Sequence, residues 1–204
     1  MVNRIPWWAL GSSVGAPVLL AGGLTFAEIL QPPGYSPIRD TISALAARGA
    51  TDRWVMTSAL AGLGVCHLVT ALGLRPVRAG ERALLAGGGV ATVMVAAFPQ
   101  PVVGNSVAHT VAATAAFVSL AVWPAFGAHL RSEAPLLTFK RSLAASAFLV
   151  GLVVWFVAEV HGSERGLAER AAAGAQALWP LAVVVTTRRA LSRKIHVNDG
   201  ALRS

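Results

Sequence analysis

Apolar residues run along this chain in long blocks that alternate with short polar segments. A helix needs about 17 to 25 mainly apolar residues to cross the hydrocarbon core of a bilayer, and six blocks reach or approach that length. The blocks are Trp7 to Leu30, Trp54 to Leu74, Ala83 to Phe98, His109 to Leu130, Leu143 to Val160 and Ala171 to Thr187. The pattern predicts an all-α polytopic membrane protein, built as a bundle of six transmembrane helices.

The third block contains Gly87, Gly88 and Gly89 in succession. Three glycines lower the helix propensity of this block, but they let a neighbouring helix approach its backbone closely. We therefore expect the third helix to lie in the middle of the bundle.

The segment between the first two blocks has a helical pattern of its own. Ser36 before Pro37 is a helix-start signal, and Gly49 is a helix-stop signal. The apolar residues between them recur at helical spacing and are Ile38, Ile42 and Leu45. These features predict a short amphipathic helix from Pro37 to Ala47, which lies on the surface or dips into the mouth of the bundle.

The basic residues fall mainly into alternate connections between the blocks. Of the 17 basic residues, 12 lie in one set of connections and 5 in the other. The larger set is Arg4, Arg75, Arg78, Arg82, Arg131, Lys140, Arg141, Arg188, Arg189, Arg193, Lys194 and Arg203, and the smaller set is Arg39, Arg48, Arg53, Arg165 and Arg170. Because cytoplasmic loops carry the excess of Lys and Arg, this asymmetry predicts that both termini are cytoplasmic.

Composition agrees with an integral membrane protein. Of the 204 residues, 55% are hydrophobic and 13% are charged, whereas soluble domains carry more polar surface. Six spans use nearly the whole chain, which predicts one transmembrane domain over residues 1–190, a basic cytoplasmic tail over residues 191–204 and a multi-pass location in the plasma membrane. Attraction to anionic lipid headgroups explains the net charge of +8, so nucleic acid is not an expected partner.

Polar and ionisable residues gather in the connections predicted to lie outside. Such groups are costly near a membrane interior, so they tend to pair, to line aqueous cavities or to form a site. The candidate ligand-binding residues are Arg39, Asp40, Ser43, His109, Glu159, His161, Arg165 and Arg170. Since an arginine fork pairs well with phosphate or carboxylate, we expect the outer mouth to bind a lipid headgroup or other amphiphile. Asp40 and Glu159 would orient the arginines, and the helix from Pro37 to Ala47 would act as a lid.

An intramembrane hydrolase or transferase that acts on lipid is an alternative. His109 and His161 would then serve as metal ligands or general bases, and Ser43 would need an adjacent base to act as a nucleophile. The sequence has no H-E-x-x-H, no H-x-x-x-H and no cysteine cluster, and Ser43 does not lie in a G-x-S-x-G motif. No metal and no cofactor is therefore predicted, and the chain is not assigned as an enzyme.

A small transporter or proton-coupled carrier is a further alternative, with His67 and Glu28 as its ionisable groups. It would require a polar path across the bundle, yet apart from His67 and Gln176 the middle of the spans is mainly apolar. His67 is expected to be buried, neutral and hydrogen bonded to a carbonyl or hydroxyl. Besides membrane lipids, partners left open are another membrane protein, in a larger complex, and a second copy of the chain.

Four segments resemble a known family. They read YSPIRDTISALAARG over residues 35–49, RWVMTSALAGLGVCHLVTALGL over residues 53–74, GNSVAHTVAA over residues 104–113 and HGSERGLAERAA over residues 161–172. Together they resemble the prokaryotic membrane family catalogued as domain of unknown function 998, over about residues 8 to 190. More distantly, D-x-I-S at Asp40 to Ser43 is similar to the I-S-D outer loop of the six-helix family of damage-regulated autophagy modulators, although here the acid precedes the serine. The resemblance implies a six-helix bundle whose outer polar face matters.

Overall fold

The computed structural model describes residues 4–127, 132 and 134–201. The predictions for Leu130, Arg131 and Arg203 therefore lie outside the described residues. The helices are α1 Trp7–Ile29, α2 Ile42–Leu45, α3 Trp54–Gly73, α4 Ala79–Ala97, α5 Val107–Phe126, η1 Pro135–Leu137, α6 Phe139–Ala158 and α7 Arg165–Ala201. The all-α prediction is confirmed, and each apolar block overlaps one long helix.

Four of the described helices, α1, α3, α5 and α6, are long and apolar enough to cross a membrane. The helix α4 is less apolar than these four, because Glu81 and Arg82 lie near its start and three glycines lower its mean hydropathy. The apolar stretch of α7 contains Gln176 and is flanked by arginines, which lowers its mean hydropathy as well. By length and composition, two of the six predicted spans, α4 and α7, are thus not identified as membrane-crossing helices.

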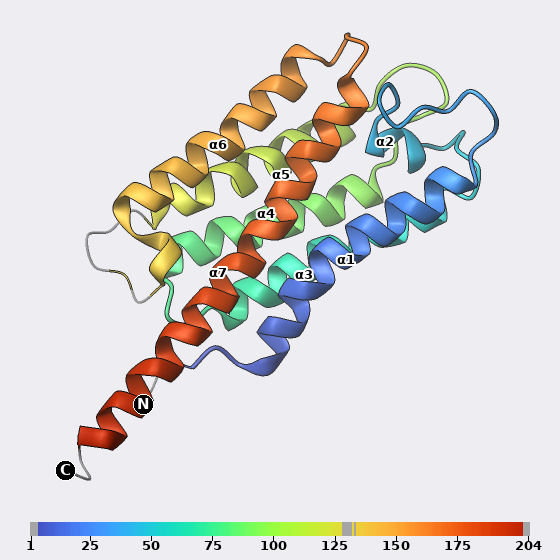
Figure 1. Cartoon of the computed structure of the whole chain (residues 1–204). Helices are drawn as coiled ribbons and strands as arrows, with labels where there is room; N and C mark the ends of the chain where they lie inside the picture. Colours follow the sequence, from blue (N-terminus) through green and yellow to red (C-terminus); the bar gives the residue numbers. More distant parts are fainter. Residues whose placement is uncertain (1–3, 128–131, 133, 202–204) are drawn as a thin grey trace.

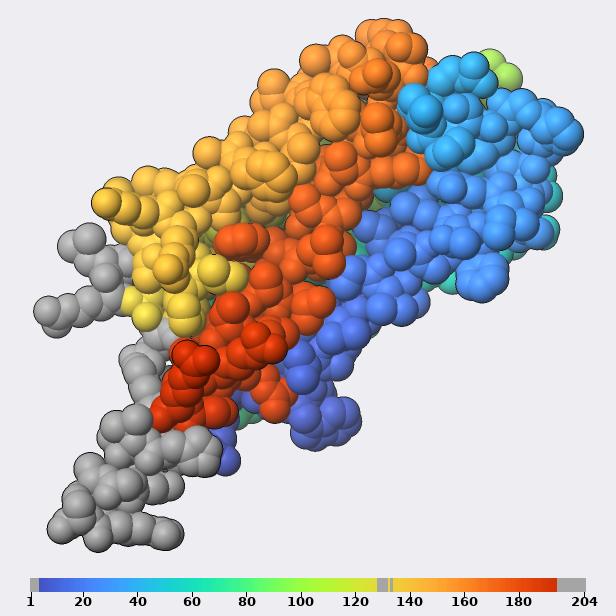
Figure 2. Space-filling view, in the orientation of Figure 1, coloured from blue at the N-terminus to red at the C-terminus, as the bar shows by residue number. Residues whose placement is uncertain are grey.

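The long helices form a closed ring. Each of α1, α3, α4, α5 and α6 packs against its neighbour in chain order, and α7 closes the ring by packing between α6 and α1 (Figure 1). In the space-filling view α7 runs along the front of the molecule between these two helices (Figure 2). The loop that contains α2 lies at one end of the ring, which we call the α2 end. The N-terminal segment and the last turns of α7 lie at the other end, which we call the tail end.

The three glycines of α4 meet three different surroundings. A Cβ atom on Gly89 would lie 2.7 Å from the Gly64 carbonyl oxygen of α3, and one on Gly88 would lie 2.7 Å from the side chain of Leu120 of α5. A Cβ atom on Gly87 would meet no atom within 4 Å. The glycines do permit close packing, but α4 is a member of the ring between α3 and α5, so the prediction of a central helix is wrong.

The helix between α1 and α3 is shorter than the predicted Pro37–Ala47 helix. The helix α2 is a single turn, Ile42–Leu45, and the side chain of Thr41 caps it by accepting a hydrogen bond from the Ala44 amide at 3.1 Å. Ile42 and Leu45 are buried. The segment is therefore anchored in the core of the bundle.

Hydrogen bonds to α7 explain why α2 is short. In a continuous helix the Ile38 carbonyl would accept from the Ile42 amide. Instead, the Ile38 carbonyl accepts from the amides of Gly166 and Leu167, at 2.9 and 3.0 Å. The Ile42 amide donates to the Glu169 carboxylate at 2.5 Å. Both groups bond to α7, so the helix cannot extend toward its N-terminus.

Alanine substitutions in the glycine run should separate packing from helix propensity. Gly89→Ala should lower the free energy of unfolding by about 1–3 kcal/mol, because its methyl group meets backbone atoms of α3. Gly87→Ala is the matched control and should leave stability unchanged or raise it by up to about 1 kcal/mol, since alanine is the better helix former. Unfolding of both variants in mixed detergent micelles measures the difference, and equal midpoints would contradict the close approach of α3 and α4.

Candidate functional site at the α2 end

The start of α7 is joined to the loop that precedes α2. The first N–H groups of a helix have no partner within the helix, and here the Ile38 carbonyl accepts two of them. Arg165 Nε also donates to the Arg39 carbonyl at 2.8 Å. A Cβ atom on Gly166 would collide with the carbonyl oxygens of Pro37 and Asp40. Only glycine therefore lets the loop lie this close to α7.

Arg170 links three segments at this end. Its Nε and Nη2 donate to Glu28 Oε1 at the end of α1, at 3.0 and 2.7 Å. Its Nη1 donates to the carbonyls of Asp40 and Gly166, at 2.7 and 3.0 Å, and Nη2 also donates to the Tyr35 hydroxyl. A guanidinium has five N–H donors, so every donor of Arg170 has an acceptor.

The Arg170 linkage is shielded from solvent. The side chains of Arg170 and Glu28 are 15% and 27% exposed. Burial raises the pKa of Tyr35 to about 12, and the nearby Glu28 carboxylate adds to this effect, while Arg170 opposes it. The Tyr35 hydroxyl therefore stays protonated at neutral pH and neutralises no charge, which leaves Glu28 as the counter-ion of Arg170.

The preceding residue of α7, Glu169, belongs to a second polar cluster. Its Oε2 accepts from the Ile42 amide at 2.5 Å, and its Oε1 lies 3.3 Å from Ser43 Oγ. His109 Nε2 lies 3.1 Å from the same Ser43 Oγ. His109 Nδ1 lies 2.8 Å from the Phe98 carbonyl oxygen, which fixes the orientation of the ring. Glu169 and His109 are both buried.

The contact between Ser43 and His109 has the geometry of a nucleophile beside a general base. Acyl transfer also needs free N–H donors for the oxyanion. At the start of α2, where Ser43 lies, the Ile42 amide is occupied by the Glu169 carboxylate. The cluster therefore has the base that a serine nucleophile needs, but the adjacent oxyanion donor is already bonded.

A cavity of about 60 Å³ lies beneath α2 inside the ring. Its polar lining consists of Ser43, His67, Thr92, Glu169 and Gln176, and the remaining lining is apolar. His67 is 1% exposed, as expected of a buried histidine. Neither of its ring nitrogens has a hydrogen-bond partner among the described residues. The predicted bond from His67 to a carbonyl or hydroxyl is therefore wrong.

Six of the eight predicted binding residues lie in or beside these two clusters. Ser43 and His109 belong to the Glu169 cluster, and Arg170 is the centre of the other. The Asp40 carboxylate accepts from the Ser36 amide at 2.8 Å, so only its backbone carbonyl bonds to Arg170. Arg39 and Arg165 lie exposed where the loop meets α7.

The other two predicted residues, Glu159 and His161, lie in the turn between α6 and α7. The Glu159 carboxylate accepts from the Glu164 amide at 3.2 Å, so it stabilises that turn. His161 is exposed and has no hydrogen bond to a described residue. Neither carboxylate that was expected to orient the arginines does so through an ion pair with a described residue. Within the described part of the chain, no three His, Cys, Asp or Glu side chains gather as a metal site would require.

The predicted binding set leaves out Glu28, Tyr35 and Glu169, which carry much of the geometry. Glu28 is the one acidic residue in the first apolar block, and a carboxylate so placed is a sign of a buried partner. Glu169 could not be told from an exposed helix residue, because its spacing from Arg165 fits a surface ion pair. The fold decides which of these carboxylates is buried.

Removing Arg170 should destabilise the α2 end more than removing an exposed neighbour. Arg170→Ala leaves the Glu28 carboxylate and two carbonyls without donors, so unfolding should become easier by about 2–3 kcal/mol. His161→Ala should change stability little. In a double-mutant cycle, Glu28→Ala should cost less in the Arg170→Ala background than in the wild type. Strictly additive effects in detergent unfolding would contradict the linkage.

Comparisons with curated proteins and with solved structures found no match to this chain. A family model described as Protein of unknown function (DUF998) matches residues 13–186. The matched region covers most of the ring and includes both polar clusters and the central cavity. It also agrees with the extent of the resemblance in the sequence. The chain therefore belongs to the DUF998 family.

Proposed function

We propose that this protein spans the plasma membrane with six helices and binds the anionic headgroup of an amphiphile at its α2 end, which faces outward. The observation that carries this proposal is a surface patch where the loop meets α7. We call it the rim patch, and it consists of Ile38, Arg39, Arg165 and Leu167. The patch combines exposed positive charge with exposed apolar surface, which is the combination that an anionic amphiphile requires.

The closed ring supports six spans. The helices α4 and α7 pack lengthwise against helices that are apolar enough to cross a membrane, so they share the depth of those helices. Lipid would surround such a ring on all sides. The exposed apolar side chains of α1, α5 and α6, such as Phe26, Val111 and Phe148, are suited to that environment.

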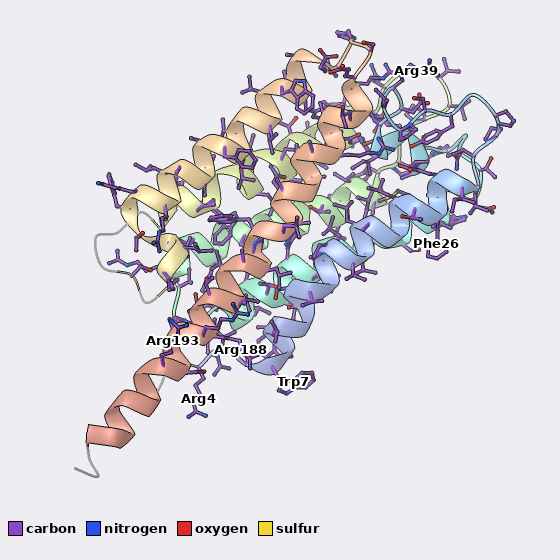
Figure 3. The ribbon with its side chains drawn as sticks, viewed as in Figure 1. Arg4, Trp7, Phe26, Arg39, Arg188 and Arg193 are labelled. Carbon is purple, nitrogen blue, oxygen red and sulfur yellow. The ribbon has the colours of Figure 1, made fainter. Side chains whose placement is uncertain are left out.

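The distribution of charge supports the orientation. Arg4, Arg188 and Arg193 lie toward the tail end, whereas Arg39 lies at the α2 end (Figure 3). The basic tail of α7 also extends from the tail end (Figure 1). An excess of basic residues marks the cytoplasmic side, which favours an outward-facing α2 end.

The rim patch has the chemistry to hold a headgroup. Arg165 uses Nε to donate to the Arg39 carbonyl, and Arg39 makes one long bond of 3.4 Å to the Gly34 carbonyl. Their remaining N–H groups have no partner among the described residues and are free to pair with phosphate or carboxylate. Ile38 and Leu167 are 50% and 42% exposed, so they can contact the apolar part of the same molecule.

Arg170 is assigned a different role from the one the sequence suggests. All five of its donors are occupied within the protein, so a headgroup could bind it only by displacing these partners. Its contacts instead hold the loop against α7. We propose that Arg170 supports the rim patch, while Arg39 and Arg165 make the contacts with the ligand.

A lipid hydrolase or acyltransferase is the second candidate, because Ser43 Oγ lies 3.1 Å from His109 Nε2. Substrate would have to displace the Glu169 carboxylate from the Ile42 amide to gain an oxyanion donor. A fluorophosphonate probe tests this directly. Labelling of Ser43 that is lost in His109→Gln would favour the enzyme, and an unlabelled wild type would favour the binding protein.

Thiol labelling tests the orientation. In a Cys66→Ser background, Ser163→Cys should react with a membrane-impermeant maleimide in intact cells, because this residue is exposed at the α2 end. Gly80→Cys should react only after the membrane is permeabilised, since it lies at the exposed start of α4 near the tail end. Labelling in the opposite order would reverse the orientation and rule out an outer site.

Lipid titrations test the rim patch. We expect purified protein in neutral detergent to bind dihexanoyl phosphatidylglycerol, and the double variant Arg39→Gln/Arg165→Gln to bind it at least tenfold more weakly. A tenfold loss corresponds to about 1.4 kcal/mol, less than the net value expected of two charge-assisted hydrogen bonds. Calorimetry or NMR titration gives the affinities.

Arg48→Gln/Arg53→Gln is the matched control, because it also removes two charges, from positions of the same loop that lie outside the rim patch. An equal loss of affinity in this control would mean that net charge alone attracts the lipid. Inorganic phosphate should compete only weakly. Full competition by phosphate would show that the patch recognises a free anion rather than an amphiphile.

A further inference from the structure

His67 presents a buried imidazole to the central cavity. A neutral imidazole carries one donor and one acceptor, and neither has a partner among the described protein groups. Buried polar groups in folded proteins are almost always hydrogen bonded to protein or to water. The hydrogen-bonding capacity of His67 is therefore directed to whatever occupies the cavity.

The cavity is suited to water. A volume of about 60 Å³ has room for about four to six water molecules at 10–15 Å³ each. Apolar cavities stay dry, but this one has polar side chains at several positions of its wall. The Gln176 amide donates to the Phe117 carbonyl, and the Thr92 hydroxyl donates to the Gly88 carbonyl. Each still has an acceptor oxygen to offer.

The Glu169 cluster at the α2 end of the cavity can move a proton. A carbonyl oxygen only accepts, so His109 Nδ1 must donate to Phe98. His109 Nε2 then either accepts from Ser43 or, when the ring is charged, donates to it. In the first case the Ser43 hydroxyl donates to His109 Nε2. Glu169 must then be protonated so that it can donate to Ser43 Oγ. In the second case Ser43 donates to an ionised Glu169.

The two arrangements contain the same number of protons. To pass from the first to the second, Glu169 gives its proton to Ser43 Oγ as the Ser43 proton transfers to His109 Nε2. The hydroxyl bond of Ser43 is broken and re-formed on its other side, and a neutral pair becomes a carboxylate and an imidazolium. Ser43 is thus the relay atom between an acid and a base.

We propose that the central cavity is a hydrated proton-binding site, in which His67 exchanges protons with the α2 end through cavity water and the Glu169–Ser43–His109 cluster. Among the residues that line the cavity, His67 and Glu169 are the only titratable acid and base. The helices α1, α4 and α5 present apolar side chains and the Thr92 hydroxyl, and Arg170 is held by Glu28. This inference is independent of headgroup binding at the rim patch.

NMR of histidine labelled with ¹⁵N in lipid nanodiscs tests the proposal, with His67→Gln to assign the ring signals. We expect cross-peaks between the His67 ring and water, and rapid exchange of its ring N–H with solvent. Ala116→Leu should remove the cross-peaks, because Ala116 lines the cavity and the larger side chain displaces water. Ala115→Leu is the matched control on the exposed face of α5 and should behave as the wild type.

Ser43→Ala tests the relay without filling the cavity. It should keep the cross-peaks to water but slow the exchange of the His67 ring N–H at least tenfold, since the path through the relay atom is interrupted. Two results would overturn the proposal. One is a wild-type His67 without contact to water, and the other is an exchange rate that Ser43→Ala leaves unchanged.

Discussion

The structure at the α2 end depends on how the first turn of α7 satisfies its free N–H groups. A helix whose first turn is covered by another segment cannot leave these donors unpaired without a loss of stability. Here the partner is the Ile38 carbonyl, which belongs to a loop more than 120 residues earlier in the chain. The capping bonds therefore hold the loop before α2 against α7 and bring residues that are far apart in the chain into one site.

Two consecutive residues of α7, Glu169 and Arg170, bond to different parts of the molecule. Arg170 points to the end of α1 and binds Glu28, whereas Glu169 points to α2 and binds Ile42 and Ser43. Neighbours in a helix are separated by about 100° around the axis, so one turn reaches both sides of the loop. The rim patch and the Glu169 cluster are consequently built on the first two turns of α7, although they face different surroundings.

The long helices could be predicted from the sequence, because apolar block length and charge placement are properties of single segments. Their arrangement as a ring was not predicted. The bounds of α1 and α3 differ from the predicted blocks by one residue, since Trp7 and Trp54 mark the helix starts. The predicted helix from Pro37 was wrong because its carbonyls bond to α7, which no local pattern reveals. For the same reason Glu169 could not be recognised as buried, and His67 was assigned a partner that the folded chain does not provide.

The closeness of the two sites has a consequence for how they would work together. A headgroup that pairs with Arg39 and Arg165 would contact both the loop and the first residue of α7. These two segments are joined by the hydrogen bond from Arg165 to the Arg39 carbonyl. Any shift of this junction also moves Glu169 relative to Ser43, where the distance is already 3.3 Å. Because hydrogen bonds weaken steeply as they lengthen, a small movement at the rim would be enough to make or break the proposed proton relay. If both proposals hold, ligand binding outside the ring and proton exchange inside it would therefore be mechanically linked through the start of α7.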